Sequence, residues 1–137
     1  MELIRGVSVL EHRVHADARG RLIALEEPGT LPFVLKRVFS VMVDARHVVR
    51  GGHANSCDEF IVALSGSVLI EADNGAERTS VRLRDHDRAL WVRAGTLIHL
   101  RAFEPGTILL VCASATHADT RRFDRPQPQL IEADRPT

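Results

Sequence analysis

The chain has 137 residues, and its eighteen basic and eighteen acidic side chains give a formal net charge of zero. This length suits one domain, and the spread of charge argues against nucleic acid or an anionic membrane as a main partner. The two cysteines, Cys57 and Cys112, form no C-x-x-C pair, and no apolar leader precedes Glu2 and Arg5. These features predict a reduced, cytoplasmic setting.

Short apolar or alternating runs follow one another along the chain and predict an all-β fold. Turn residues separate them, notably D-N-G at 73–75 and E-P-G at 104–106. Residues 3–14 also alternate, so this segment is either a first strand of the same fold or a strand added to a neighbour's sheet. The other expected strands are 21–25, 34–43, 59–64, 67–72, 79–84, 89–92, 97–103 and 107–114.

The C-terminal part of the sequence has a different character. A short helix is possible over 117–123, and the proline-rich tail over 125–137 is expected to be extended or disordered. No linker or repeat divides the chain, so residues 1–137 are expected to form a single domain. Many short strands joined by Gly-rich turns indicate a double-sheet jelly roll or small barrel, whose interior can hold one small ligand.

The stretch R-G-G-H-A-N-S-C-D-E at 50–59 raises the question of a metal site. Alternate side chains of a strand share a face, so His53, Asn55 and Glu59 could converge inside a barrel with His99 from a later strand. A metal-dependent small cupin enzyme that uses His53, Glu59 and His99 as a facial triad is therefore one alternative. Against it, Asn is a weak neutral ligand, and R-A-G-T-L-I-H at 93–99 lacks the proline and the Gly-to-His spacing of metal-binding cupins.

Several longer motifs occur together over residues 15–123. They are D-x-R-G at 17–20, L-x-x-x-E-E at 22–27, P-F-x-x-K-R-V at 32–38 and R-G-x-H-A at 50–54. In these motifs the chain resembles the WxcM-like sugar-nucleotide 3,4-ketoisomerases, which act on dTDP-4-keto-6-deoxyglucose on the way to 3-amino deoxysugars. The resemblance implies a cupin double-stranded β-helix, a nucleotide-linked keto sugar as substrate, a homodimer, and no metal or other cofactor.

The resemblance also implies roles for individual side chains. The equivalent of His53 belongs to a catalytic histidine pair, and the equivalent of Arg19 binds or polarises the substrate. Moving a ketone from C4 to C3 of a hexose requires removal of one carbon-bound proton and its return to the neighbouring carbon, which suits a neutral imidazole. A cation stabilises the enolate oxygen that forms, and Arg37 or Arg50 could bind the diphosphate by a bidentate contact.

The chain departs from the family around the expected substrate. Asn55 stands where the family has a second histidine, Phe39 stands where it has tyrosine, and the sequence contains no Tyr. His99 could supply the missing imidazole. A divergent isomerase is thus the leading interpretation, and a non-catalytic cupin that binds a sugar nucleotide or another small molecule is an alternative. The candidate catalytic residues are His53, Arg19 and His99, and the candidate substrate-binding residues are Arg37, Arg50, Asn55, Glu59 and Phe39.

Overall fold

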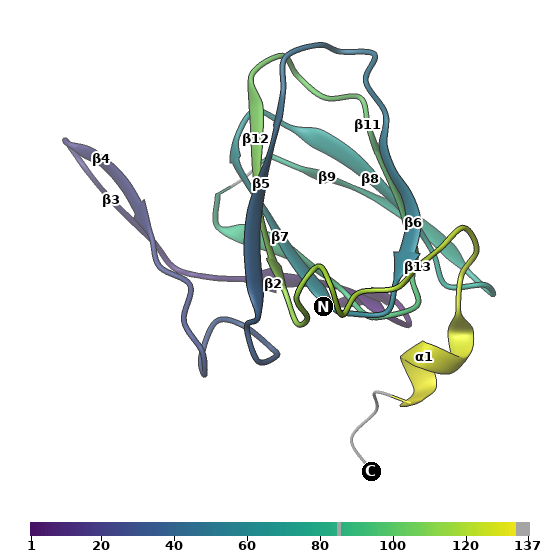
Figure 1. Ribbon diagram of the computed structural model, residues 1–137. Coiled ribbons are helices and arrows are strands. Elements are labelled where there is room, and N and C mark those ends of the chain that lie inside the picture. Colours follow the sequence, from purple (N-terminus) through teal and green to yellow (C-terminus); the bar gives the residue numbers. More distant parts are fainter. Residues whose placement is uncertain (85, 134–137) are drawn as a thin grey trace.

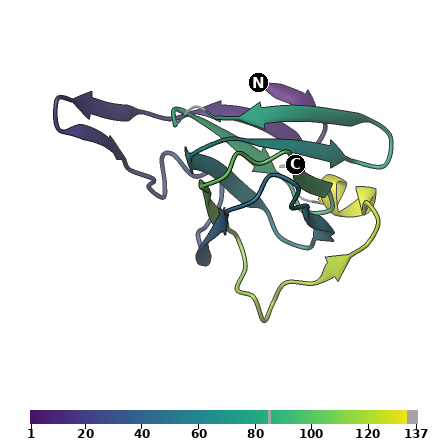
Figure 2. The ribbon, with the colours of Figure 1, turned by 90° about the horizontal axis from the view of Figure 1, so that it is seen from above.

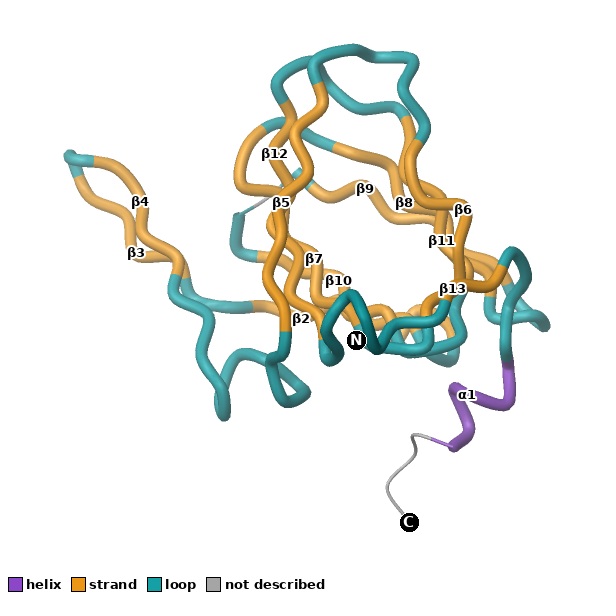
Figure 3. The backbone as a smooth tube through the Cα atoms, viewed as in Figure 1, coloured by secondary structure: helices purple, strands orange, loops and turns teal. Residues whose placement is uncertain are grey.

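The computed structural model describes residues 1–84 and 86–133 and is built almost entirely of antiparallel strands (Figure 1). A six-stranded sheet has the order β1-β2-β10-β7-β12-β5, and a five-stranded sheet has the order β13-β6-β11-β8-β9. The two sheets face each other and enclose the barrel interior, which is clearest in the backbone tube of Figure 3. The predicted all-β jelly-roll barrel is confirmed.

Each expected strand range overlaps an observed strand, including the β8-β9 hairpin around the D-N-G turn, whereas β3, β6 and β13 were not among the expected ranges. Their bounds are β1 (Glu2–Ile4), β2 (Val7–Glu11), β3 (Val14–Asp17), β4 (Gly20–Ile23), β5 (Arg37–Val43), β6 (Arg50–Asn55), β7 (Glu59–Ser65), β8 (Val68–Asp73), β9 (Arg78–Leu83), β10 (Arg88–Val92), β11 (Leu97–Arg101), β12 (Thr107–Ala113) and β13 (Arg122–Phe123).

Strand β7 is buried on both faces, which explains its continuous apolar sequence F-I-V-A. Ile61 and Ala63 belong to the main core between the two sheets. Phe60 and Val62 belong to a second cluster, which includes Leu31 from the long connection between β4 and β5. That connection therefore packs against the outer face of the six-stranded sheet.

Strands β3 and β4 form a separate hairpin that projects from the barrel (Figures 1 and 2). The segment 3–14 before it supplies β1 and β2, and β2 pairs with β10 of the same chain. Of the two interpretations of that segment, a first strand of the same fold is the one observed.

Two predictions about the C-terminal part are wrong. Residues 117–123 contain a turn followed by β13 instead of a helix, and the tail includes the helix α1 (Pro128–Ala133). A proline is tolerated at the first position of a helix because its missing N–H would have no intrahelical partner there. Ile131 anchors the helix, with 2% of its surface exposed. Residues 134–137 of the predicted tail lie outside the described residues. No helix in the described part of the chain is long and apolar enough to span a membrane.

Candidate active site inside the barrel

The backbone of β6 is bent by a β-bulge at its two glycines. In the pairing of β6 with β11, His53 lies opposite Ile98 and Gly51 lies opposite His99, so Gly52 is an extra residue. Gly51 and Gly52 have φ angles of +83° and +81°, which glycine adopts without the strain that a side chain would bring. A Cβ at Gly51 would lie 2.8 Å from the carbonyl oxygen of Ile98. The two glycines of R-G-G-H thus allow the bulge after which His53 points into the barrel.

A cavity of about 200 Å³ lies between the two sheets, and His53 lines it. Its remaining polar lining consists of Arg50 and Asn55 from β6, Glu59 from β7 and Arg122 from β13. The other walls are almost entirely apolar and come from β5, β6, β7, β11 and β12. They are formed by Phe39, Val41, Gly51, Ile61, Ile98, Leu100 and Val111. Five of the predicted site residues, His53, Asn55, Glu59, Arg50 and Phe39, therefore meet in one cavity.

Glu59 is a buried carboxyl group, with 7% of the residue exposed. The side-chain amide of Asn55 donates a hydrogen bond of 3.2 Å from Nδ2 to Oε1 of Glu59. Burial raises the pKa of the Glu59 carboxyl, because the charged form loses hydration. The hydrogen bond from Asn55 and the positive charges of Arg37 and Arg122 offset part of that increase in pKa.

Arg122 is a cavity residue that the sequence interpretation missed. It lies directly opposite Asn55 in the pairing of β13 with β6, so the two side chains share the face that lines the cavity. No local pattern reveals this, because the two residues are far apart in the chain. Arg37, which was predicted, does not line the cavity, and its guanidinium lies 5.0 Å from the centre of the Phe39 ring that does.

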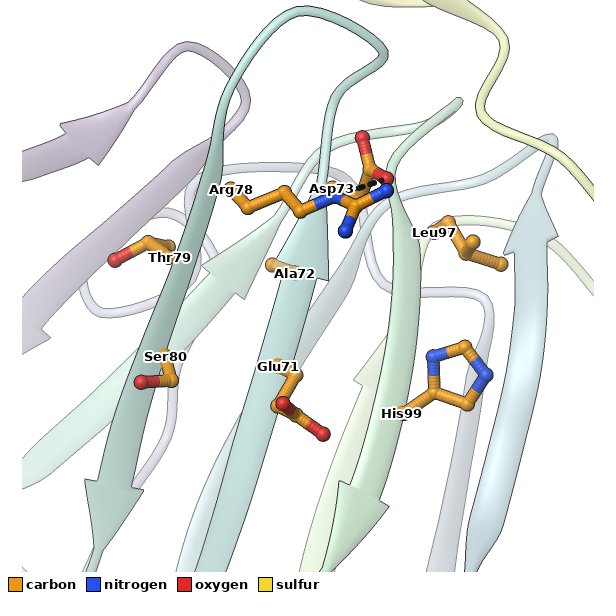
Figure 4. A pocket seen from close by; sticks show the side chains of 8 residues that line it. All are labelled: Glu71, Ala72, Asp73, Arg78, Thr79, Ser80, Leu97 and His99. Atoms are coloured by element: carbon orange, nitrogen blue, oxygen red, sulfur yellow. Dashed lines mark hydrogen bonds and ion pairs between the residues drawn. The ribbon is translucent and has the colours of Figure 1, made fainter.

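His99 does not share the cavity with His53. On β11 the neighbours Ile98 and Leu100 point inward, so His99 points to the outer face of the five-stranded sheet. There it borders an open hollow of about 460 Å³ over β8 and β9, together with Glu71 and Arg78 (Figure 4). The prediction that His99 replaces the missing imidazole therefore fails on geometry, because the inward position belongs to Ile98.

The same geometry separates the residues of the suggested metal triad. His53 and Glu59 face the barrel interior, whereas His99 faces outward. Within residues 1–84 and 86–133, no three His, Cys, Asp or Glu side chains gather closely enough to hold a metal ion. The triad of His53, Glu59 and His99 is therefore not assembled by this fold.

Arg19 lies in the turn of the β3-β4 hairpin, which projects away from the barrel (Figure 1). Its side chain is 91% exposed and pairs with Asp17, with 2.6 Å between Nη2 and Oδ2. The hydrogen bond from Arg19 lowers the pKa of the Asp17 carboxyl. Within one chain, the structure does not bring Arg19 to His53.

Asp58, the residue before Glu59, is a buried carboxylate with 5% of the residue exposed. It accepts hydrogen bonds from the Trp91 indole, at 3.0 Å, and from the backbone N–H of Ala94, at 2.8 Å. It also pairs with Arg93, with 3.5 Å between Oδ2 and Nε. Next to Ala94, the N–H of Gly95 donates to the carbonyl of Asn55 at 2.8 Å. Asp58 thus ties the loop before β11 to the segment between β6 and β7, and the Gly95 hydrogen bond joins the same loop to Asn55.

Replacing Asp58 by alanine is expected to destabilise the fold by about 3–5 kcal/mol, because a buried charge network loses its acceptor. Urea unfolding at equilibrium measures this difference. Asp44→Ala, which removes an exposed carboxylate from a loop, is the matched control. A loss for Asp58→Ala no larger than that of the control would show that the network contributes little.

The comparison with protein families decides where this chain belongs. Residues 5–124 match the family model FdtA: WxcM-like, C-terminal. The chain belongs to this family. The match spans all the strands from β2 to β13, and with them the whole cavity.

Named relatives agree with that family. A protein of Aneurinibacillus thermoaerophilus named TDP-4-oxo-6-deoxy-alpha-D-glucose-3,4-oxoisomerase is 28% identical over 120 residues, which cover 85% of this chain and 86% of the relative. The sugar 3,4-ketoisomerase QdtA from Thermoanaerobacterium thermosaccharolyticum, solved in complex with TDP, superposes with a TM-score of 0.81 at 25% identity and covers 96% of each chain. The TDP-quinovose 3,4-ketoisomerase WlaRB from Campylobacter jejuni superposes with a TM-score of 0.83 at 28% identity. The superposition covers 94% of this chain and 99% of WlaRB.

Proposed function

We propose that the protein is a sugar-nucleotide 3,4-ketoisomerase that moves the keto group of a dTDP-linked 4-keto-6-deoxyhexose from C4 to C3. The observation that carries the proposal is the position of His53, whose imidazole lines a cavity with apolar walls and two guanidinium groups. Membership of the family and the names of the relatives support the same reaction and the same class of substrate.

The cavity residues suit proton transfer next to a carbonyl group. A neutral His53 removes the proton from C3, which is acidified by the C4 ketone, and returns it to C4 of the resulting enediolate. A nearby guanidinium stabilises the negative charge on the enediolate oxygen. Because the imidazole ends in its starting state, the reaction consumes no cofactor.

The size of the cavity indicates which part of the substrate enters it. Its volume of about 200 Å³ is below the roughly 300–1,000 Å³ of pockets that enclose a drug-sized ligand. The hexose is therefore the part that we place inside, with the nucleotide outside. Arg50 and Arg122 line the cavity and Arg37 lies beside it, so a guanidinium is available to bind the diphosphate in bidentate fashion.

Incubation with dTDP-4-keto-6-deoxyglucose in heavy water is expected to place deuterium at C3 or C4 of the sugar, because the transferred proton exchanges with solvent while it resides on His53. Proton NMR and mass spectrometry of the product measure the incorporation. A failure to exchange or convert any nucleotide-linked keto sugar would overturn the isomerase proposal.

One observation favours a second function, which is binding without turnover. His53 is the sole imidazole among the cavity-lining residues of the described chain, and Asn55 cannot titrate. A thermal shift with dTDP in the absence of any exchange or conversion would identify a sugar-nucleotide binding protein instead of an isomerase.

A homodimer in the cytoplasm is the setting that we propose for this activity. Strand β5 lies at the edge of its sheet and exposes Val38 and Met42, which are 54% and 67% accessible, and Leu22 of the projecting hairpin is 58% accessible. Edge strands with exposed apolar residues favour pairing with another chain. In such a dimer, the hairpin of one copy is available to carry Arg19 to the other copy. The free thiols of Cys57 and Cys112 suit a reducing compartment.

A further inference from the structure

The proposed isomerisation moves two protons, and His53 accounts for only one of them. The carbon-bound proton passes from C3 to C4. The hydroxyl proton of O3 must also leave, and O4 must gain a proton, because the ketone and the hydroxyl exchange places. A site that handles both transfers needs a second group that can give up a proton and take one back.

Glu59 is the one carboxyl group among the cavity-lining residues of the described chain. It begins β7, whose next inward residue, Ile61, also lines the cavity. The Asn55 amide holds Oε1 of Glu59 at 3.2 Å, so Oε2 is the oxygen left to face a ligand. His53 and Asn55 occupy alternate positions of β6 and therefore share a face. This places the imidazole and the carboxyl group around one cavity.

Asn55 itself has a polar atom that points to a ligand. Its Oδ1 is buried and accepts no hydrogen bond from the protein, although its Nδ2 is bound to Glu59. A buried acceptor without a donor is costly unless a ligand supplies one. A sugar hydroxyl group in the cavity would donate to Oδ1 and would then lie beside the Glu59 carboxyl group.

The charges around Glu59 come from several strands. His53 and Arg50 of β6 and Arg122 of β13 line the same cavity, and the positive charge of Arg37 on β5 also acts on Glu59. Cys57 and Asp58 precede Glu59 in the chain, and Asp58 is engaged by Trp91 and Arg93. Burial outweighs the positive charges, so the pKa of Glu59 is raised and its neutral acid form persists to higher pH than in an exposed glutamate.

We propose that Glu59 is a second catalytic residue, which carries the hydroxyl proton between O3 and O4 while His53 carries the carbon-bound proton between C3 and C4. This proposal rests on the proposed function. As His53 removes the C3 proton, a guanidinium stabilises the negative charge that develops on the C4 oxygen, and Glu59 gives its proton to that oxygen to complete an enediol. The Glu59 carboxylate then takes the O3 proton as the imidazolium returns its proton to C4. Carbon 3 is oxidised, carbon 4 is reduced, and both side chains end as they began.

This assignment gives Asn55 a defined task. Asn55 does not transfer a proton but orients the carboxyl group through Oε1. The second titrating group of the reaction is then the Glu59 carboxyl group instead of a second imidazole. The use of a carboxyl group as the second proton carrier predicts a pH dependence of the rate, because activity requires the acid form of Glu59. The rate should fall as the pH rises through the raised pKa of Glu59.

Glu59→Gln is expected to lower kcat by at least about 10²-fold, because an amide keeps the shape and the hydrogen bond but cannot give up a proton. The alkaline decline of the rate should disappear with it, and Glu59→Asp should restore part of the activity. The matched control is Glu71→Gln, which removes a carboxylate from the outer face of the barrel. If kcat of Glu59→Gln stays within threefold of the wild-type value and still falls as the pH rises, the role of Glu59 is overturned. The proposed isomerisation would stand.

A measurement on the wild-type protein covers the case in which Glu59→Gln does not fold. The ¹³C NMR titration of the glutamate carboxyl groups should contain one raised pKa that coincides with the alkaline decline of kcat. A decline at a pH where no glutamate titrates would overturn the role of Glu59. An inactive wild-type protein would instead remove the proposed isomerisation and this assignment together.

Discussion

Replacing His53 by glutamine is expected to lower kcat for the proposed isomerisation by about 10²–10⁴-fold, the range that a general base contributes. The amide of glutamine can hydrogen-bond to the substrate but cannot remove a proton from carbon. Solvent deuterium should then enter neither C3 nor C4. Conversion rates and deuterium incorporation, measured on the same samples, test both parts of this prediction.

The barrel offers a matched control for His53. His99 is a second imidazole on the neighbouring strand β11, but it faces the outer surface of the sheet. His99→Gln should therefore keep the wild-type rate. Both histidines are exposed, so neither change should alter the melting temperature appreciably. Equal losses of activity in the two variants would show that the inward position of His53 is not what matters.

The strands were predictable because their signal is local. Alternation of apolar residues and turn sequences such as D-N-G act over a few residues, and the structure places β8 and β9 on either side of that turn. The helix at 128–133 was not predictable in this way, because its stability depends on burying Ile131 against the distant residue Gly6. Tertiary packing overrides local preference in such segments.

The site was predictable only in part, because a cavity depends on which face of a strand each residue occupies. On β6 the residues Gly51, His53 and Asn55 all line the cavity, and Glu59 of β7 joins them. On β11 the side chain expected to point into the cavity was His99, but the residue that does so is its neighbour Ile98. A shift of one residue moves every side chain to the other face, and the motif alone does not fix it.

Arg19 lies in the turn of the projecting β3-β4 hairpin. Its motif was the reason to assign it to the site, yet the hairpin that carries it points away from the cavity of its own chain. If Arg19 takes part in the proposed reaction, the cavity that it serves belongs to a second copy. Removing one positive group that stabilises an enolate oxygen is expected to cost about 10²–10³-fold in kcat, so Arg19→Gln alone should be nearly inactive.

Mixing the two inactive variants is therefore expected to restore activity. In a dimer of one Arg19→Gln chain and one His53→Gln chain, the first chain keeps its imidazole and receives Arg19 from its partner. Random exchange makes half of the dimers mixed, each with one complete site, so the mixture should recover about one quarter of the wild-type rate. The unfractionated mixture measures this recovery. Chains with different tags, refolded together and purified through both tags, isolate the mixed dimers, which should reach about one half of the wild-type rate. Arg21→Gln changes a neighbouring exposed arginine of the same hairpin and should be active without mixing. No recovery in mixed dimers would show that Arg19 does not act across the dimer, because two sites that were each complete within one chain would both stay defective.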